Sequence, residues 1–446
     1  MMNNIRTLID HLERSGRITH IRKEVDPKFE VGAVIRTGEG KQPFYFEKIK
    51  GYDMPMVSGL GGDRDLLAET MGIGKKDLLK KLIDSIVHPL PTRKVASGPV
   101  HDNVVLKPFR LTDHFPVCTY HKDDSGAYLV SGIVVVKERN GNKRYTSIRR
   151  MQLLEGNRAS VLISSPELYQ QYLEYEKQGE PMEIAVMFGI VPAVILSSQI
   201  STHLYHCDKL DVAGALLGHP LDVVQAKTVD LEVLAEAEVV LEGRILPYVR
   251  EPEGPFGELA GYYGECTPQP VIEFSAITYR NQPIWQTIYP SGYEEHLPMA
   301  LAREATLLST VRQVVPEVLN VHLTVGGIGR YHAVISIRKR TEGDAKQALL
   351  AAFASDKDLK HVVVVDEDVD LFNPQDVEWA IATRVQADLD VFIVSGAKGS
   401  PLEPSHQLRG VSAKMGIDAT YPLNAKEAYR RTSIPTDSHF NIKDYL

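Results

Sequence analysis

The stretch Ala127–Arg150, AYLVSGIVVVKERNGNKRYTSIRR, decides the fold class of this chain. Two apolar and β-branched runs flank Arg139-Asn-Gly-Asn142, and an Asn-Gly pair between such runs is typical of a two-stranded hairpin. Further short runs with strand propensity occupy residues 182–190, 193–198, 237–245, 269–279 and 284–289. Only 165–179 and 210–218 interrupt them as helices. So many short strands in one block predict a β-barrel or β-sandwich core.

The segments on either side of this block alternate between helical and strand patterns. Residues 4–15 predict an amphipathic helix because Ile5, Leu8, Ile9 and Leu12 recur at helical spacing. Strands are expected at 42–49 and 55–60 and a helix at 75–88, before a proline-rich linker at 88–103. After residue 297, helices at 298–313 and 343–353 alternate with strands such as 360–366, which indicates another α/β domain. The polar tail from 401 is expected to pack on another surface.

We therefore expect a mixed α/β and β protein with three domains. An N-terminal α/β domain covers residues 1–105, a central β-barrel domain 106–297, and a C-terminal α/β domain with an oligomerisation tail 298–446. No run of eighteen apolar residues exists and the N-terminus lacks a signal peptide's apolar core, so we expect a cytoplasmic protein with no membrane span. The net charge of −8 gives no general attraction to nucleic acid. Three cysteines without paired spacing favour a reducing compartment.

The segment Pro252–Glu258, PEGPFGE, is the strongest candidate for a site. Its two prolines fix φ, and its two glycines permit conformations that other residues rarely reach. Glu253 and Glu258 held on such a rigid loop would keep a defined separation, as paired acid/base groups require. The alternative is a tight loop whose glutamates face water.

Arg149 and Arg150 close the hairpin strand, and strand alternation would send one of them to solvent and the other inward. An inward arginine needs a carboxylate partner, and the PEGPFGE glutamates could supply it. The alternative is a surface pair. Two metal patterns are weaker: residues 203–208 (HLYHCD) lack a second ligand pair for zinc, and the acids of 366–370 favour solvation of a strand end over Mg²⁺.

Taken together, Arg150, PEGPFGE and the order of the surrounding elements resemble the UbiD family of reversible, prenylated-FMN-dependent decarboxylases. The segments AGALLGHPL (213–221), AEAEVVLEGRILP (235–247) and HVVVVDEDVDLFNPQDVEWAIATR (361–384) are also similar. The resemblance covers roughly residues 5 to 425 and implies a split β-barrel as the flavin-binding central domain.

By this resemblance, Arg150, Glu253 and Glu258 form the catalytic group over one face of the flavin ring. The cofactor is then an electron sink, and Glu258 is the expected proton donor, which requires a pKa raised by burial. Glu253, paired with Arg150, would set the geometry. The residues that the resemblance assigns to the cofactor are Thr146, Ser147, Ile148, Arg150, Ser197, Ser198, Gln199, Lys209 and Lys346.

The metal that holds the cofactor phosphate in this family would lack its three ligands here. The asparagine position is Tyr145, the histidine falls near Pro166-Glu-Leu168, and the glutamate position is Lys209. Mn²⁺ or K⁺ is therefore left open. Our hypothesis is that the Lys209 ammonium replaces the cation and pairs with the phosphate directly.

The segment 290–296, PSGYEEH, lies where the family builds its substrate pocket. His296 and Arg303 stand seven residues apart and would share a helix face. Such groups suit a second carboxylate or a ring heteroatom, and the chain's length resembles that of members acting on furan-2,5-dicarboxylate. We expect furan-2,5-dicarboxylate first, then a pyrrole-, indole- or hydroxybenzoate-type acid. The alternative is that His296 caps the helix and Arg303 makes a surface pair.

Two functions from other classes stay open. A cofactor-free enzyme with paired carboxylates, such as a glycosidase, would leave Arg150 and Lys346 without a role. A flavin-binding or assembly subunit would bind the cofactor without releasing CO₂. The expected partners are a small aromatic or heteroaromatic acid, CO₂, a prenyl-FMN synthase and further copies of the chain, as a dimer or hexamer.

Overall fold

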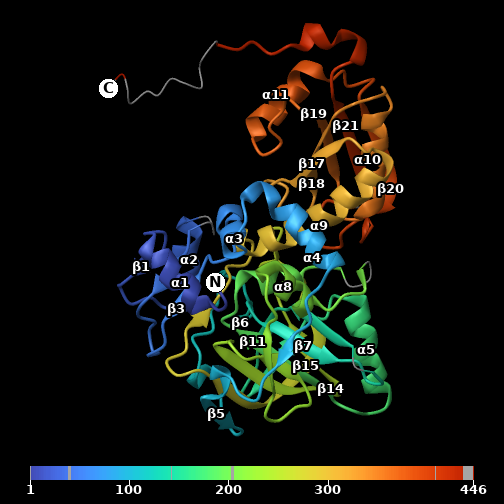
Figure 1. The fold of residues 1–446 in the computed structure, drawn as a ribbon. Helices are drawn as coiled ribbons and strands as arrows, with labels where there is room; N and C mark the ends of the chain where they lie inside the picture. Colours follow the sequence, from blue (N-terminus) through green and yellow to red (C-terminus); the bar gives the residue numbers. More distant parts are fainter. Residues whose placement is uncertain are drawn as a thin grey trace. The chain divides into compact units, whose positions relative to one another are not determined.

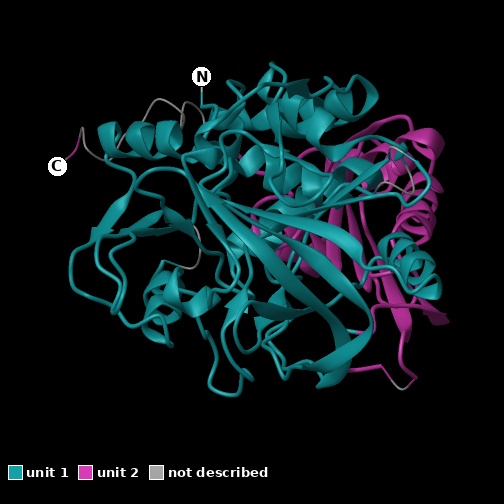
Figure 2. Ribbon diagram, turned by 90° about the horizontal axis from the view of Figure 1, so that it is seen from below, with its two compact units in different colours: residues 1–306, 325–330, 402–404 teal, residues 307–324, 331–401, 405–446 magenta. Residues whose placement is uncertain are grey.

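A computed structural model describes residues 2–38, 42–141, 143–201, 205–406, 408–434 and 445. The chain forms two compact units (Figures 1 and 2). The first holds residues 1–306, 325–330 and 402–404, and the second holds 307–324, 331–401 and 405–446. In the described part of the chain, no helix combines the length and the apolar character that a membrane crossing needs.

The N-terminal part of the first unit is a four-stranded sheet in the order β1-β2-β3-β16. The strand β16, expected within the central block, instead pairs in parallel with β3. The predicted amphipathic helix is confirmed, because all four of its apolar residues are buried against this sheet. The elements are α1 (Ile5–Arg14), β1 (Thr19–Ile21), α2 (Glu30–Thr37), β2 (Phe44–Phe46), β3 (Met56–Ser58), α3 (Arg64–Thr70), η1 (Lys75–Asp77), α4 (Leu78–Val87) and β16 (Trp285–Gln286).

The centre of the first unit is a nine-stranded sheet that curls into a half-barrel. Eight strands follow the order β6-β9-β10-β15-β14-β11-β7-β8, and β5 pairs with β15. The predicted hairpin is confirmed, since β7 and β8 pair antiparallel. The strands are β5 (Asn103–Leu106), β6 (Tyr128–Leu129), β7 (Ile133–Lys137), β8 (Arg144–Ile148), β9 (Met151–Leu153), β10 (Arg158–Val161), β11 (Met182–Phe188), β14 (Val239–Glu253) and β15 (Thr267–Tyr279).

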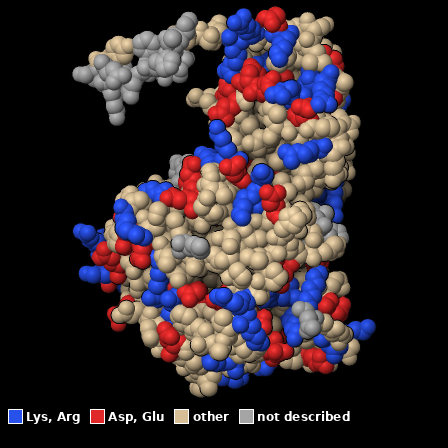
Figure 3. Space-filling view, in the orientation of Figure 1, with Lys and Arg blue, Asp and Glu red and all other residues tan. Residues whose placement is uncertain are grey.

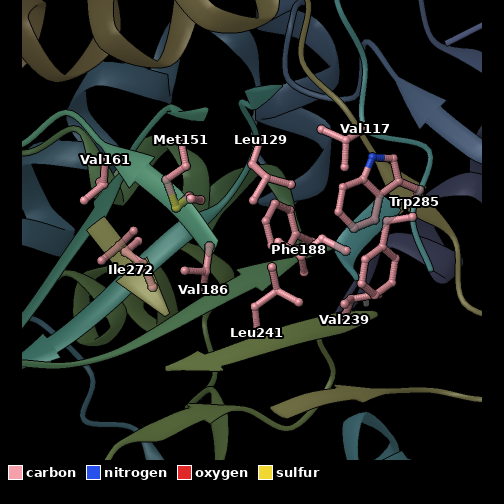
Figure 4. Close-up of a cluster of buried hydrophobic side chains, with 14 of the residues drawn as sticks. Val117, Leu129, Met151, Val161, Val186, Phe188, Val239, Leu241, Ile272 and Trp285 are labelled. Atoms are coloured by element: carbon pink, nitrogen blue, oxygen red, sulfur yellow. The ribbon is translucent and has the colours of Figure 1, made fainter. Parts of the chain in front are cut away.

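Strand alternation gives this sheet two apolar faces. On β11, Val186 and Phe188 join the large core cluster drawn in Figure 4, whereas Ala185 and Met187 join a second cluster. A sheet that is buried on both faces explains why its strands are nearly continuous apolar runs. The mixed α/β and β fold class is therefore confirmed.

The second face of the sheet is covered by helices α6 (Pro192–Ser198) and α8 (Lys209–Leu217) and by a small sheet in the order β13-β12-β4. The predicted strand at 193–198 is wrong, because these residues belong to α6. All of α6 is buried, and a short apolar run gives no periodicity that separates a buried helix from a buried strand. The remaining elements here are β4 (Arg93–Lys94), η2 (Pro99–His101), η3 (Leu111–Asp113), α5 (Pro166–Lys177), β12 (Asp222–Gln225) and β13 (Glu232–Leu234).

The second unit is a five-stranded sheet in the order β17-β18-β19-β21-β20 with helices α10 and α11. The expectation that the tail from 401 lies outside a core is wrong, because β21 pairs with β19 on one side and β20 on the other. The elements are β17 (Val318–Leu323), β18 (His332–Ile337), α10 (Asp344–Ser355), β19 (His361–Asp366), α11 (Pro374–Arg384), β20 (Val391–Lys398), β21 (Val411–Ala419) and η4 (Leu423–Tyr429).

Charged side chains of both signs are interspersed over the face shown in Figure 3. In the second unit, the acidic run after β19 is held by an arginine. Arg384 donates to Asp366 at 2.8 Å and to Asp368 at 2.7 Å. These two acids therefore take part in an ion-pair network and do not simply solvate the strand end.

Candidate active site

Arg150 brings together the two glutamates of the PEGPFGE segment. Arg150 follows β8, Glu253 is the last residue of β14, and Glu258 lies in the loop beyond it. The guanidinium donates from Nη2 to Glu253 Oε2 at 3.0 Å and from Nη1 to Glu258 Oε1. The predicted convergence of these three residues is therefore present in the structure.

This charged group is largely shielded from solvent. The side-chain exposures of Glu253, Arg150 and Glu258 are 0%, 13% and 14%. Burial by itself would lower the pKa of Arg150, but the Glu258 and Glu253 carboxylates outweigh it and raise that pKa. The guanidinium therefore stays charged. Arg150 Nε and Glu253 Oε1 are buried and have no hydrogen-bond partner among the described residues.

Aromatic rings support the arginine from the loop side. The Arg150 guanidinium carbon lies 4.8 Å from the ring centroid of Phe256, and the Tyr128 ring centroid is 4.3 Å from that of Phe256. A cation over an aromatic face is attracted by the ring quadrupole, more strongly where water is excluded. Phe256 thus adds an aromatic contact to the guanidinium of Arg150, besides its hydrogen bonds to the two carboxylates.

Two polar side chains hold the backbone of the loop in place. Gly254 N donates to Gln152 Oε1 at 3.0 Å, and Gly257 N donates to Asp124 Oδ1 at 2.9 Å. Burial favours a higher pKa for Asp124, but hydrogen bonds from His121 and Gly257 dominate and lower it. Asp124 therefore acts as a charged acceptor for loop amides. Neither Gln152 nor Asp124 was predicted from the sequence.

The glycines of the loop and its return are required by close approach. Gly254 has φ +97°, and a Cβ there would lie 2.8 Å from the Glu265 carbonyl oxygen. At Gly257 a Cβ would overlap the His121 ring, and at Gly264 it would lie 2.6 Å from Glu258 Oε1. Close contacts at these glycines therefore restrict the backbone of this segment.

The first turn of α9 (Tyr293–Val314) clamps the far end of the loop. The helix begins five residues before Pro298, where the sequence predicted its start. Ser291 Oγ donates to the Glu258 carbonyl at 2.5 Å, and His296 Nε2 donates to the Leu259 carbonyl at 2.8 Å. His296 is therefore inside the helix and does not cap it.

The charged residues at the start of α9 lie close to the catalytic group. Burial raises the pKa of Glu295, and the nearby Glu258 carboxylate acts in the same direction. Arg303, the second predicted substrate residue, is half-buried on the same helix. Glu295 was missed from the sequence because nothing marked its distance from Glu258.

The predicted cofactor residues lie on two neighbouring elements of the first unit. Thr146, Ser147 and Ile148 belong to β8, and Ser197 and Ser198 end α6, with Gln199 as its C-cap. The hydroxyls of Ser197 and Ser198 bond to carbonyls of their own helix. Thr146 Oγ1 is buried and has no partner among the described residues, so a polar contact with a ligand remains available there.

The predicted cofactor lysines have different settings. Lys209 is the first residue of α8, and its Nζ donates to the Ser198 carbonyl at 2.7 Å. Lys346 is an exposed residue of α10 in the second unit, and its role stays a prediction. Within the described ranges, no three His, Cys, Asp or Glu side chains come together as a metal site. His203 of the weak zinc pattern lies outside the described residues.

Family models match nearly the whole chain. The UbiD N-terminal, Rift-related and C-terminal domains of 3-octaprenyl-4-hydroxybenzoate carboxy-lyase match residues 9–86, 93–293 and 296–419. Among curated relatives, the anhydromevalonate phosphate decarboxylase of Methanothermobacter thermautotrophicus is 34% identical and covers 96% of this chain and 99% of its own. The gallate decarboxylase of Lactiplantibacillus plantarum is 31% identical and covers 96% of each chain.

Solved structures agree with these matches. The UbiD-class enzyme HmfF from Pelotomaculum thermopropionicum, in complex with FMN, is 46% identical, with a TM-score of 0.97 over 99% of this chain and 100% of that one. An evolved dimeric form of HmfF in complex with prFMN is 44% identical, with a TM-score of 0.93 over 100% of each chain. The expectation of a prenylated flavin is thereby confirmed for the class. The chain belongs to the UbiD family of carboxy-lyases.

Proposed function

We propose that this protein decarboxylates a heteroaromatic carboxylic acid with prenylated FMN as its cofactor, and that furan-2,5-dicarboxylate, converted to 2-furoate, is the first candidate substrate. The observation that carries the proposal is the bridge from Arg150 to both Glu253 and Glu258. A cofactor-free pair of carboxylates would not need a buried arginine between them, so a glycosidase-like reaction accounts for less of the site.

The residues that are present suit a flavin. Arg150 Nε, Glu253 Oε1 and Thr146 Oγ1 are buried polar atoms that need partners, because an unsatisfied buried polar atom costs about 1–3 kcal/mol. When bound, prenylated FMN would supply an electron sink for the electron pair of the carbon–carboxylate bond. We assign Thr146, Ser147, Ile148, Ser197, Ser198 and Gln199 to the lining of its site, and Lys209 to its phosphate.

The three charged residues take separate roles in the proposed reaction. Arg150 orients the substrate carboxylate, and Glu253, fully buried behind it, fixes the guanidinium. Glu258 is less deeply buried and delivers the proton that replaces CO₂ on the ring carbon. The overall change converts the carboxylate and one proton into a C–H bond and CO₂, so no external oxidant is required.

The substrate assignment is supported by groups on α9. His296 donates from Nε2 to the Leu259 carbonyl, so that in the doubly protonated ring Nδ1 would also donate, to a substrate carboxylate, and Arg303 follows two turns later. A diacid has a second carboxylate for these groups. A second candidate is an aliphatic phosphorylated acid, because four relatives named anhydromevalonate phosphate decarboxylase align along 92–97% of this chain.

The test is CO₂ release by the full-length protein produced with a prenyl-FMN synthase, a proposed partner in the cell. The panel holds furan-2,5-dicarboxylate, 2-furoate, pyrrole-2-carboxylate, indole-3-carboxylate, gallate and anhydromevalonate phosphate. We expect the highest kcat/KM for the furan diacid. Preference for gallate or for the phosphorylated acid would replace the substrate assignment, and no release from any acid would favour the assembly-subunit alternative. Cytoplasmic location and assembly into a dimer or hexamer are further parts of this proposal.

A further inference from the structure

Arg149, the neighbour of the catalytic arginine, is a half-buried cation that forms no ion pair with a carboxylate of the described residues. Its Nη1 donates to Ser164 Oγ at 2.9 Å, and its backbone N–H donates to the Gly132 carbonyl at 3.2 Å. Its Nε is buried and has no partner among the described residues. Burial lowers the pKa of Arg149 to about 10. The side chain therefore carries a positive charge that nothing in the described chain neutralises.

Lys209 places a second cation in the same region. Helices α6 and α8 both pack against β8, the strand that leads into Arg149. The described chain offers the Lys209 ammonium one acceptor, the neutral carbonyl of Ser198. Burial lowers the pKa of Lys209 to about 8, and the charge of Arg149 is the next cause. The positive charge of Arg149 thus acts unfavourably on that of Lys209.

The charges of Glu167 and Asp208 both favour the charged form of Lys209, but Asp208 forms its ion pair with another cation. Arg144 is the first residue of β8, the strand that ends just before Arg149. It pairs with Asp208 at 2.9 Å and lies 3.6 Å from Asp211 and 3.7 Å from Glu232. Asp208 is next to Lys209 in the chain, yet its side chain bonds to Arg144 and caps α8. Arg144 is therefore paired with carboxylates, whereas neither Arg149 nor Lys209 forms an ion pair with a described residue.

A third unsatisfied group lies toward the same helices. Thr146 is paired across the sheet with Val135, and opposite residues of a strand pair share a face. Val135 packs in the cluster that contains Val194 of α6 and Leu210 of α8. The buried Thr146 hydroxyl, which has no partner among the described residues, therefore projects to the side that these helices cover.

Half-buried cations that lack a paired carboxylate are unfavourable, and an anion bound by both would satisfy them. A phosphate monoester carries close to two negative charges near neutral pH, suits the planar fork of arginine and accepts the point charge of lysine. We propose that Arg149 and Lys209 form a metal-independent cradle for the phosphate of a flavin mononucleotide. This rests on the proposed function for the identity of the ligand, and adds Arg149 to it.

The experiment compares FMN with riboflavin, which differ only by the phosphate. Affinities of the full-length apoprotein for both are measured by flavin fluorescence, after treatment with EDTA. We expect Arg149→Gln and Lys209→Gln each to lower FMN affinity about ten- to hundredfold and to leave riboflavin affinity unchanged, as loss of one charge-assisted hydrogen bond predicts. Arg144→Gln, which removes a paired arginine from the same strand, is the matched control and should keep the wild-type ratio.

The ratio of FMN to riboflavin affinity decides the outcome. An unchanged ratio in both variants, or a wild-type FMN affinity that collapses with EDTA and returns with Mn²⁺, would overturn the cradle. If Arg149→Gln does not fold, two other variants carry the test. Arg149→Lys keeps the charge but loses the guanidinium fork, and Lys209→Gln leaves Arg149 in place; each should lower FMN affinity and leave riboflavin affinity unchanged. A normal FMN ratio with no CO₂ release from any acid would refute the proposed reaction while leaving the binding site intact.

Discussion

The imidazole of His296 and the backbone of Leu259 are joined by a 2.8 Å hydrogen bond, in which Nε2 donates to the carbonyl oxygen. Leu259 directly follows Glu258, whose own carbonyl accepts from Ser291 Oγ. The start of α9 thus fixes two consecutive peptide groups beside the proposed proton donor. His296, which the sequence predicted for substrate binding, thus holds the loop that carries Glu258.

Kinetics can separate the loop contact of His296 from its proposed contact with the substrate. We expect His296→Asn to lower kcat about tenfold for every accepted acid, as loss of one positioning hydrogen bond predicts, and to raise KM for the diacid alone because Nδ1 is lost. Ser291→Ala is the matched control, because it releases the loop without touching the imidazole. It should lower kcat without a change in KM specific to the diacid. Equal KM changes for mono- and diacids would remove His296 from the substrate site.

Replacement of Arg150 by lysine tests the bridge. Lysine keeps the charge but cannot donate in a fixed fork to Glu253 and Glu258 together. We expect kcat/KM to fall about a hundredfold or more, because small displacements of catalytic groups cost that much. Flavin content measured by absorbance separates this from cofactor loss. A variant that keeps more than a tenth of the wild-type rate would show that the bridge is dispensable.

Gly264→Ala is a local probe of Glu258. The new Cβ would lie 2.6 Å from Glu258 Oε1, so the carboxylate must move away from Arg150, whereas the backbone of Gly264 has no positive φ. We expect near-normal thermal stability with a large loss of kcat. Gly261→Ala is the contrasting control: its site has φ +77° and nothing within 4 Å of a Cβ, so stability should fall without displacement of Glu258.

Glu294 gives the first unit a predictable pH dependence. Its carboxylate accepts from Gly59 N at 2.6 Å and Gly61 N at 3.1 Å, yet burial raises its pKa from 4.5 to about 7. Between these values the folded chain holds a proton that the unfolded chain releases. The contribution of Glu294 to stability is therefore complete below pH 4.5 and is lost as the pH rises through 7, a change of about 3 kcal/mol.

The measurement is the unfolding free energy of wild type and Glu294→Gln at pH 5 and pH 8.5. The glutamine does not titrate, so the variant should gain about 3 kcal/mol relative to wild type over this interval. A Trp379→Phe background leaves the buried Trp285 as the fluorescent reporter of the first unit. Parallel curves for the two proteins would show that Glu294 does not titrate in this range.

The sequence predicted the hairpin, the first helix and the convergence of Arg150 with two distant glutamates. Those successes rest on turn chemistry, periodicity and a specific motif. The run 193–198 was misassigned because a fully buried apolar segment has no periodic signature. Pro298 was placed at the start of a helix, where proline is favoured, but α9 begins at Tyr293 and has completed its first turn before Pro298.

The surroundings of Arg149 could not be predicted from sequence spacing alone. Alternation predicted that one of the two arginines faces solvent, but β8 ends at Ile148, so the rule no longer applies at 149 and 150. Both side chains are at most partly exposed. Two adjacent arginines at the end of a strand were the available signal. The carboxylates that Arg150 meets are 103 and 108 positions away in the chain, whereas the side-chain partner of Arg149 is Ser164.

The position of β21 between β19 and β20 has a consequence for biosynthesis. The ribosome delivers β19 and β20 first, and the strand that joins them arrives last, at residues 411–419. Until then, both neighbours carry open backbone edges that could pair with another nascent chain. A frameshift or nonsense codon shortly before residue 411 should therefore yield an aggregating product rather than a shorter enzyme.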